Sequence, residues 1–184
     1  MNRDEAINLV KENIKSPNLF KHCLAVEAIM QALAQNFGED EEKWGLAGLL
    51  HDIDYEKTKD DPQKHSLIGV KMLEDLGIDK EICEAVKVHN DAHGILPETL
   101  MEKALFVTDP LSGLIVAATL VLPSKKIADL TPENVLHRFK EKAFARGANR
   151  EVIKKCEEYL NLTLEDFIKI ALEAMQGIAS DLGL

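Results

Sequence analysis

Apolar residues recur along most of the chain at the three- and four-residue spacing of an α-helix, and no stretch shows a strong strand-like alternation. Capping residues, glycines and X-Pro pairs divide this pattern into segments. The predicted helices are residues 4–14, 18–37, 39–50, 62–76 and 79–89, a helix opened by Pro97 that includes the apolar stretch 105–122, and helices started by Thr131 and Thr163. The pattern therefore predicts an all-α fold.

Five of these helical segments carry a polar residue on the face that should be apolar. The residues are His22, His51, His65, His89 and Asp109, and Asp52 directly follows His51. A single histidine on such a face is most often a core residue with local hydrogen bonds. Five polar residues on separate helices require a common partner, because a buried ionised carboxylate is costly unless it is paired or bound to a metal. No lysine or arginine lies on the same faces, so shared metal ions are the expected partner.

The segment before His51 supports a close contact between helices. Gly48 lies one turn before His51, where a residue without a Cβ lets another backbone approach. An alternative interpretation of the His51-Asp52 pair is a histidine near the negative end of a helix dipole with a solvated aspartate beside it. His137, by contrast, has only polar neighbours at helical spacing, and we assign it no function.

Composition narrows the class of partner. The net charge of −10 and the isoelectric point near 5.1 argue against binding to nucleic acid polymers or to anionic membranes. Cys23, Cys83 and Cys156 lie far apart without CxxC spacing, so neither a disulfide framework nor a zinc-thiolate site is predicted. The polar start shows no signal-peptide core, and the stretch 105–122 is interrupted by Asp109 and a proline, which indicates a buried helix. We therefore expect a cytoplasmic protein.

One segment departs from the acidic character of the chain. Residues 138–155 carry seven basic and two acidic side chains, a local charge of +5. The segment could fold over a metal site and bind substrate phosphate, with Arg146 and Arg150 as the candidate substrate-binding residues. The alternative is a solvated helix pair whose charges balance acidic neighbours.

The order His22, His51-Asp52 and Asp109 resembles the H…HD…D signature of the HD superfamily of metal-dependent phosphohydrolases. The surrounding Ala-Gly-Leu-Leu-His-Asp-Ile-Asp and the later Val-Thr-Asp-Pro are similar to HDIG-type hydrolases. The resemblance covers about residues 18–122. It implies a single HD-type helical bundle in residues 1–122, with residues 123–184 as a C-terminal helical extension packed on the same domain.

The resemblance also implies a ligand set. One metal would be held by His22, His51, Asp52 and Asp109. Asp52 would bridge to a second ion held by His65 and His89. His93 is a candidate additional ligand, because the dinuclear subgroup often has two adjacent histidines where this chain has His89-Asn90.

The chain departs from the family pattern just after the HD pair. The glycine of HDIG is Asp54 here, and the lysine of the HDxxK variants is replaced by Tyr55, with Lys57 two positions further on. The family's auxiliary catalytic residue therefore does not transfer. Asp54 could orient the nucleophile or a histidine ligand, and Lys57 could contact phosphate; for each the alternative is a solvated loop charge. Asp52, Asp54 and Lys57 are the candidate catalytic residues.

Mixed imidazole and carboxylate ligation suits one or two ions of Fe, Mn, Co, Ni or Zn better than Mg. Together with the resemblance, it implies hydrolysis of a small phosphoester or nucleotide-like substrate by a metal-activated hydroxide. Two alternatives use the same scaffold: an HD-like di-iron oxygenase, and a noncatalytic regulatory module that binds a metal or a nucleotide.

Overall fold

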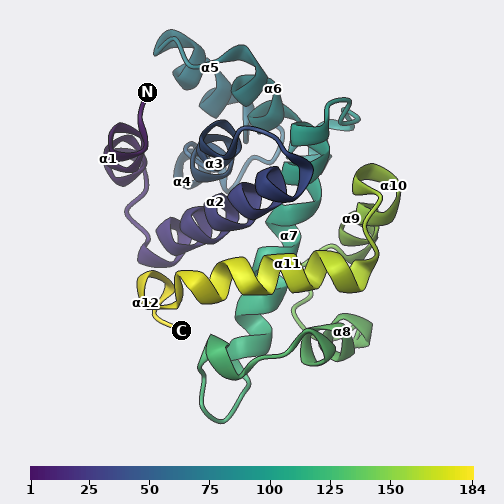
Figure 1. Cartoon of the computed structure of the whole chain (residues 1–184). Helices are drawn as coiled ribbons and strands as arrows, with labels where there is room; N and C mark the ends of the chain where they lie inside the picture. The colour runs from purple at the N-terminus through teal and green to yellow at the C-terminus, as the bar shows by residue number, and fades with distance from the viewer.

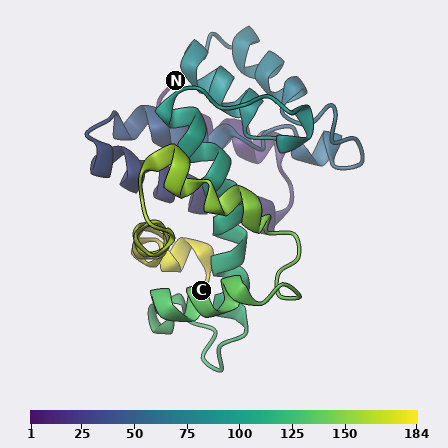
Figure 2. The ribbon, with the colours of Figure 1, turned by 90° about the vertical axis from the view of Figure 1, so that its right-hand side faces the viewer.

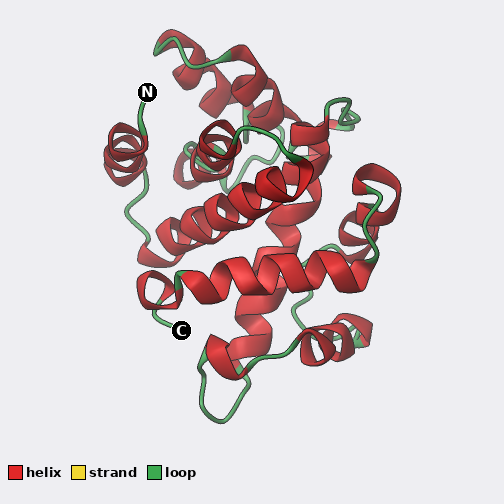
Figure 3. Ribbon diagram, viewed as in Figure 1, coloured by secondary structure: helices red, strands yellow, loops and turns green.

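The computed structural model describes all residues from 1 to 184 and contains helices, turns and loops but no strand (Figure 3). The prediction of an all-α fold is therefore confirmed. The elements in chain order are α1 (Arg3–Asn13), α2 (Pro17–Phe37), α3 (Glu41–Leu50), α4 (Tyr55–Thr58), α5 (Leu67–Asp75), α6 (Lys80–Val88), η1 (Asp91–His93), α7 (Leu100–Leu120), η2 (Ile127–Asp129), α8 (Pro132–Lys140), α9 (Arg150–Lys154), α10 (Cys156–Leu160), α11 (Leu164–Gly177) and α12 (Ala179–Leu182).

Two long helices, α2 and α7, form the centre of the fold (Figure 1). Helix α2 packs against α3, α7 and α11, and α7 also packs against α6, α8, α9 and α10. Helix α11 packs beside α2 and crosses α7, so the C-terminal part of the chain lies directly on the helices of the N-terminal part (Figures 1 and 2). One continuous cluster of 47 buried apolar residues runs from Ala6 to Leu182. The two halves of the chain therefore share one core.

Helix α7 is long and apolar enough, by length and composition, to cross a membrane. However, 61% of its most apolar 18-residue window is buried inside the fold, where helices from both halves of the chain surround it. It is the core helix that the sequence predicted. The proline that interrupts the apolar stretch, Pro110, does not end the helix, which continues through it to Leu120. It begins at Leu100 and not at Pro97, because Thr99 and Glu102 form a capping box.

The contact between α2 and α3 is unusually close at Gly48. A Cβ added to Gly48 would lie 2.9 Å from the carbonyl oxygen of Val26 and 2.9 Å from the backbone nitrogen of Glu27. The expectation that Gly48 admits another backbone is therefore confirmed. Since His22 lies one turn before Val26 on α2 and His51 follows α3, this approach sets how far apart the two histidines lie.

The region around His65 differs from the sequence prediction. Helix α5 begins at Leu67, and residues 62–66 form turns. Ser66 has a φ of 69°, in the left-handed region that serine rarely adopts. The buried carboxylate of Asp54 holds this turn and accepts hydrogen bonds from the Ser66 N–H (3.2 Å) and the Gly69 N–H (2.7 Å). These bonds cap the start of α5 from a distant part of the sequence, so His65 lies in the turn before the helix.

Candidate metal centre

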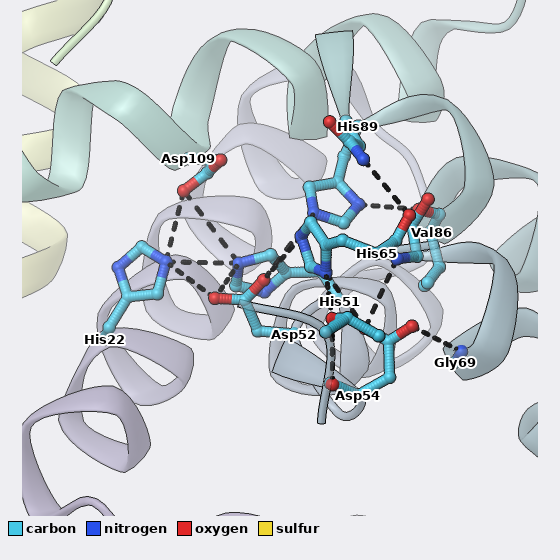
Figure 4. Close-up of polar contacts among 12 residues, drawn as sticks. His22, His51, Asp52, Asp54, His65, Gly69, Val86, His89 and Asp109 are labelled. Atoms are coloured by element: carbon cyan, nitrogen blue, oxygen red, sulfur yellow. Dashed lines mark hydrogen bonds and ion pairs between the residues drawn. The ribbon is translucent and has the colours of Figure 1, made fainter. Parts of the chain in front are cut away.

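Five segments of the chain meet at one polar cluster (Figure 4). One residue lies on α2, two lie at the end of α3, one in the turn before α5, one at the end of α6 and one on α7. In that order they are His22, His51, Asp52, His65, His89 and Asp109. All six predicted metal ligands are therefore brought together.

The first half of the cluster joins α2, α3 and α7. His22 Nε2 lies 3.1 Å from Asp109 Oδ1 and 3.1 Å from His51 Nε2. Asp52 Oδ2 faces the same two histidines, at 3.6 Å from His22 Nε2 and 3.5 Å from His51 Nε2. Two imidazole nitrogens and two carboxylate oxygens thus surround one point.

The second half of the cluster uses the other oxygen of the same aspartate. Asp52 Oδ1 lies 3.3 Å from His65 Nε2 and 3.6 Å from His89 Nε2. These two nitrogens are 3.2 Å apart. Asp52 therefore stands between two histidine pairs and directs one carboxylate oxygen toward each (Figure 4).

The outer ring nitrogens of the histidines fix the direction of the inner ones. His51 Nδ1 donates to the Gly48 carbonyl (2.7 Å), and His89 Nδ1 donates to the Val86 carbonyl. Because a carbonyl can only accept, the proton of each neutral ring lies on Nδ1, which leaves Nε2 with a free lone pair directed into the cluster.

His22 and His65 are anchored by side chains instead. His22 Nδ1 lies 3.0 Å from Ser112 Oγ, and the Ser112 hydroxyl donates to the Asp109 carbonyl (2.9 Å). The hydroxyl proton is used in that bond, so Ser112 accepts from His22. His65 Nδ1 donates to Asp54 Oδ1 at 2.9 Å. All four histidines therefore direct Nε2 inward.

The two carboxyl groups of the cluster are ionised despite their position. Burial opposes charge on Asp52, but the neighbouring His51 and a hydrogen bond from His65 hold the pKa of its carboxyl well below the usual value. Burial also opposes charge on Asp109, whose pKa is lowered by its hydrogen bond with His22. The centre therefore offers two anionic ligands at neutral pH.

The histidines respond to these anions in different ways. Burial lowers the pKa of His51 to about 4, so this ring is neutral and free to act as a ligand. Despite its burial, His65 has a pKa raised to about 9 by hydrogen bonds to Asp52 and Asp54. The carboxylates thus attract positive charge, which a proton on His65 or a bound cation can supply.

The spacing of the ligand atoms fits a divalent transition metal. Imidazole and carboxylate ligands lie about 2.0–2.2 Å from such ions, so neighbouring ligand atoms are about 3.0–3.5 Å apart. The separations of 3.1 and 3.2 Å within each histidine pair are in this range. Ligand atoms also converge within 4.8 Å of one another in two groups, His22 with His51 and Asp109, and His51 with Asp52 and His89.

Asp54 and His93 support the turn that carries His65. Asp54 binds His65 from behind and is itself fully buried. His93 Nε2 lies 2.8 Å from the His65 carbonyl oxygen and 3.0 Å from Ser66 Oγ. The ring of His93 thus faces the backbone of the turn and not the cluster, so the structure does not bring it in as an additional ligand.

The cluster lies in the wall of a large cavity with a volume of about 1280 Å³. His22, Asp52, His65, His89 and Asp109 line this cavity. Residues 139, 140, 142, 146–152 and 154 line it as well, so the basic segment and the candidate metal centre face the same cavity.

The three basic residues that the sequence analysis singled out as candidates have different environments. Arg146 lines the cavity and is exposed. Arg150 also lines it, but its guanidinium donates to backbone carbonyls of the surrounding loop, including those of Ala145 (2.6 Å) and Ala148 (2.9 Å). Lys57 is not part of the cavity; its ammonium group donates to Asn13 Oδ1 at 2.8 Å on α1. This position corrects the expectation that Lys57 contacts phosphate, because α4 directs its side chain toward α1 and not into the cavity.

Some residues near the centre were not predicted. Ser112, which anchors His22, could have been found, because it lies three residues after Asp109 on the same helical face. The ring of Tyr55 lies 5.2 Å from that of His65 and is 41% exposed at the cavity. The sequence comparison noted Tyr55 only as the residue that stands where HDxxK variants have lysine, and the short α4 that carries it has no periodic pattern to indicate a role.

Comparisons with known proteins agree with this geometry. Ribonuclease Y of Lawsonia intracellularis is 31% identical over 138 residues, which cover 73% of this chain and 26% of that protein. Ribonuclease Y of Nitratidesulfovibrio vulgaris is 31% identical over 142 residues, which cover 74% of this chain and 27% of that protein. An uncharacterized protein of Methanocaldococcus jannaschii is 33% identical over 110 residues, which cover 57% of this chain and 63% of that protein.

The chain thus spans about a quarter of the length of the ribonuclease Y relatives. A model of the HD domain family matches residues 19–114, more than half of the chain, and this range contains all six residues of the cluster. The chain belongs to the HD domain family.

Proposed function

We propose that this protein is a metal-dependent phosphohydrolase that acts on a small phosphoester or nucleotide-like substrate. The observation that carries the proposal is the position of Asp52, whose two oxygens face two separate histidine pairs. One aspartate placed in this way can bridge two divalent ions. The mixed donor set favours Fe, Mn, Co, Ni or Zn.

The residues of the chain have distinct roles in this proposal. His22, His51, Asp52 and Asp109 would hold one ion, and Asp52, His65 and His89 a second. When bound, such ions lower the pKa of water and neutralise phosphoryl oxygens. Asp54 positions His65 through its Nδ1. Substrate would enter through the cavity, where Arg146 is free to contact a phosphate group.

The relatives support the same class of reaction. Two of them are named as ribonucleases, and cleavage of RNA breaks a phosphoester bond. This chain corresponds to about a quarter of those proteins. Its net charge of −10 disfavours binding to a long polyanion, so we propose a small substrate and not an RNA polymer.

The test combines metal analysis with a turnover assay on the same sample. Protein purified without chelators should contain divalent transition metal and release phosphate or nucleotide in a screen of phosphoesters, nucleotides and dinucleotides. The Asp52→Asn variant should lose both metal content and turnover, because the amide cannot bridge two cations. Asp60→Asn, an exposed aspartate in the nearby loop, is the matched control and should retain both. A fully metallated and active Asp52→Asn protein would refute the assignment.

The same samples distinguish the alternatives. A di-iron oxygenase would contain iron, consume oxygen and give a mixed-valence signal. A noncatalytic regulatory module would be inert towards the whole panel. Exposed cations in the cavity favour the phosphohydrolase, because an uncharged organic substrate would gain nothing from them.

A further inference from the structure

The seven basic residues of the segment 138–155 fall into two groups. Three have partners within the fold: Arg138 pairs with Glu141, Arg150 donates to loop carbonyls, and Lys155 lies over the rings of Phe106 and Tyr159. The other four have no ion pair and no side-chain hydrogen bond, and all four are exposed and line the cavity. These are Lys140, Lys142, Arg146 and Lys154, which we call the cationic wall.

The cationic wall is positively charged, whereas the protein as a whole is acidic. Elsewhere on the surface, some cations are paired with a carboxylate and others are not; the paired ones include Arg3, Lys43, Lys64, Lys71 and Lys87. Near the wall the only other acidic residues of the cavity outside the cluster are Asp91 and Glu151, and Asp91 accepts a hydrogen bond from Asn149. The wall therefore keeps an excess of positive charge in a protein of net charge −10. Such charge, at a concave surface, attracts anions.

The loop between α8 and α9, which carries Lys142 and Arg146, is held in shape by Arg150. Its guanidinium donates to the carbonyls of Phe139, Glu141, Phe144, Ala145 and Ala148. These bonds occupy the guanidinium of Arg150, which lies in the middle of the segment. They leave Lys142 and Arg146 without an internal partner, on a loop whose backbone Arg150 fixes.

The candidate metal centre and the cationic wall line the same large cavity. Its volume of about 1280 Å³ exceeds the range of about 300–1,000 Å³ that is usual for small-ligand sites. Leu19, Tyr55, Phe106 and Phe139 supply apolar lining surface. A substrate with a single phosphate could reach the metal centre or the wall but would have no use for both.

We infer that the cationic wall binds a second phosphate group, so that the substrate is a bisphosphorylated or polyphosphorylated compound with one phosphate at the metal centre. This inference rests on the proposed function for the role of the metal centre. Phosphate binding by the wall itself depends only on the four cations.

Phosphate binding can be measured without turnover. The full-length protein, stripped of metal with a chelator, is titrated with inorganic tripolyphosphate by calorimetry. The triple variant Lys142→Gln, Arg146→Gln, Lys154→Gln should bind at least about tenfold more weakly than wild type, because several charge-assisted hydrogen bonds are lost. The side chains are exposed, so the substitutions should not disturb folding.

The control removes the same amount of charge elsewhere. Lys80, Lys126 and Lys169 are exposed, unpaired and outside the cavity. The triple variant with glutamine at these positions should bind tripolyphosphate as wild type does. Equal binding by the two triple variants would overturn the inference, because the effect would then be one of net charge alone.

Kinetics of the metal-loaded protein test the substrate class. The KM for ATP should rise at least about tenfold in the wall variant relative to the control variant, and the KM for AMP should rise less. Equal rises for ATP and AMP would contradict a second phosphate subsite. Failure of the proposed function would look different: no metal and no hydrolysis of any compound in the screen, with the calorimetry still deciding whether the wall binds phosphate.

Discussion

Asp54 is fully buried and makes three hydrogen bonds to one turn, through His65 Nδ1 and the N–H groups of Ser66 and Gly69. A carboxylate behind a ligating histidine orients the ring and raises its basicity. Under the proposed function, Asp54 is therefore a positioning residue for the second half of the candidate metal centre. It stands where the HDIG pattern has glycine, so this chain has replaced a flexible position by a fixed anion.

Substituting Asp54→Asn should weaken metal binding about 10- to 100-fold, because the amide keeps the shape of the side chain but loses the charge. Competition with a coloured chelator measures this affinity directly. A merely structural role would change the unfolding midpoint and leave the affinity of the folded protein intact. Asp60→Asn should match wild type in both measurements, since Asp60 is exposed and makes no hydrogen bond.

At the level of single residues, the sequence was most informative where an ionisable side chain interrupts an apolar helical face. His22 and Asp109 could be predicted for this reason, because burial without a partner is costly. Residues in loops could not be judged in the same way. Asp54 and Lys57 are both charged and three positions apart, yet one is buried behind His65 and the other bonds Asn13. Only the path of the backbone separates them.

The close approach of α3 to α2 sets the distance between the histidines of the first half. Alanine at Gly48 would place a Cβ 2.9 Å from backbone atoms of Val26 and Glu27, and backbone cannot move aside as a side chain can. We expect Gly48→Ala to lower the free energy of unfolding by about 1–3 kcal/mol. Urea denaturation measures the loss.

Gly113 and Gly177 provide the matched controls for this substitution. Gly113 lies inside α7 and Gly177 is the last residue of α11, and an added Cβ would meet no atom within 4 Å at either position. Alanine at either position should leave stability unchanged or raise it by about 0.5–1 kcal/mol, because alanine loses less backbone entropy than glycine. If Gly48→Ala behaved like these controls, the approach of the two helices would not be as tight as 2.9 Å implies.

Helix ends were predicted well where the cap is local and poorly where it is not. Gly38 ends α2 with a φ of 72°, and Thr131 and Thr163 cap α8 and α11, as expected from the sequence. The start of α5 was placed at Pro62, five residues early, because Asp54 caps it through space. A contact between residues fifteen positions apart leaves no periodic signal in the sequence.

On the scale of the whole molecule, the metal centre joins α2, α3, α6 and α7 with the turn before α5. A ligand that binds only the folded state stabilises it, by about 2.7 kcal/mol at a hundredfold excess over Kd. We expect addition of Mn or Zn to raise the Tm of the metal-free protein by about 5–10 °C. Differential scanning calorimetry measures the shift. Asp52→Asn should abolish it, and a shift of equal size in that variant would place the stabilising ion elsewhere.

The arrangement of the two halves of the chain was only partly accessible from the sequence. The local charge of +5 could be counted, and the structure places four of its cations at the cavity. The hydrogen bonds of Arg150 to the loop backbone could not be predicted, because nothing in the sequence distinguishes Arg150 from Arg146. The difference depends on which side chain the loop encloses.

The family match stops at residue 114, in the middle of α7, which continues to Leu120. A cut at that point would sever one helix and open the shared interior to water, since Ile115 and Ala118 beyond it are buried. The region that the family model matches is thus not a module that can be transplanted by itself. Changes of substrate preference are more accessible through single exposed cations facing the cavity than through exchange of the whole C-terminal part.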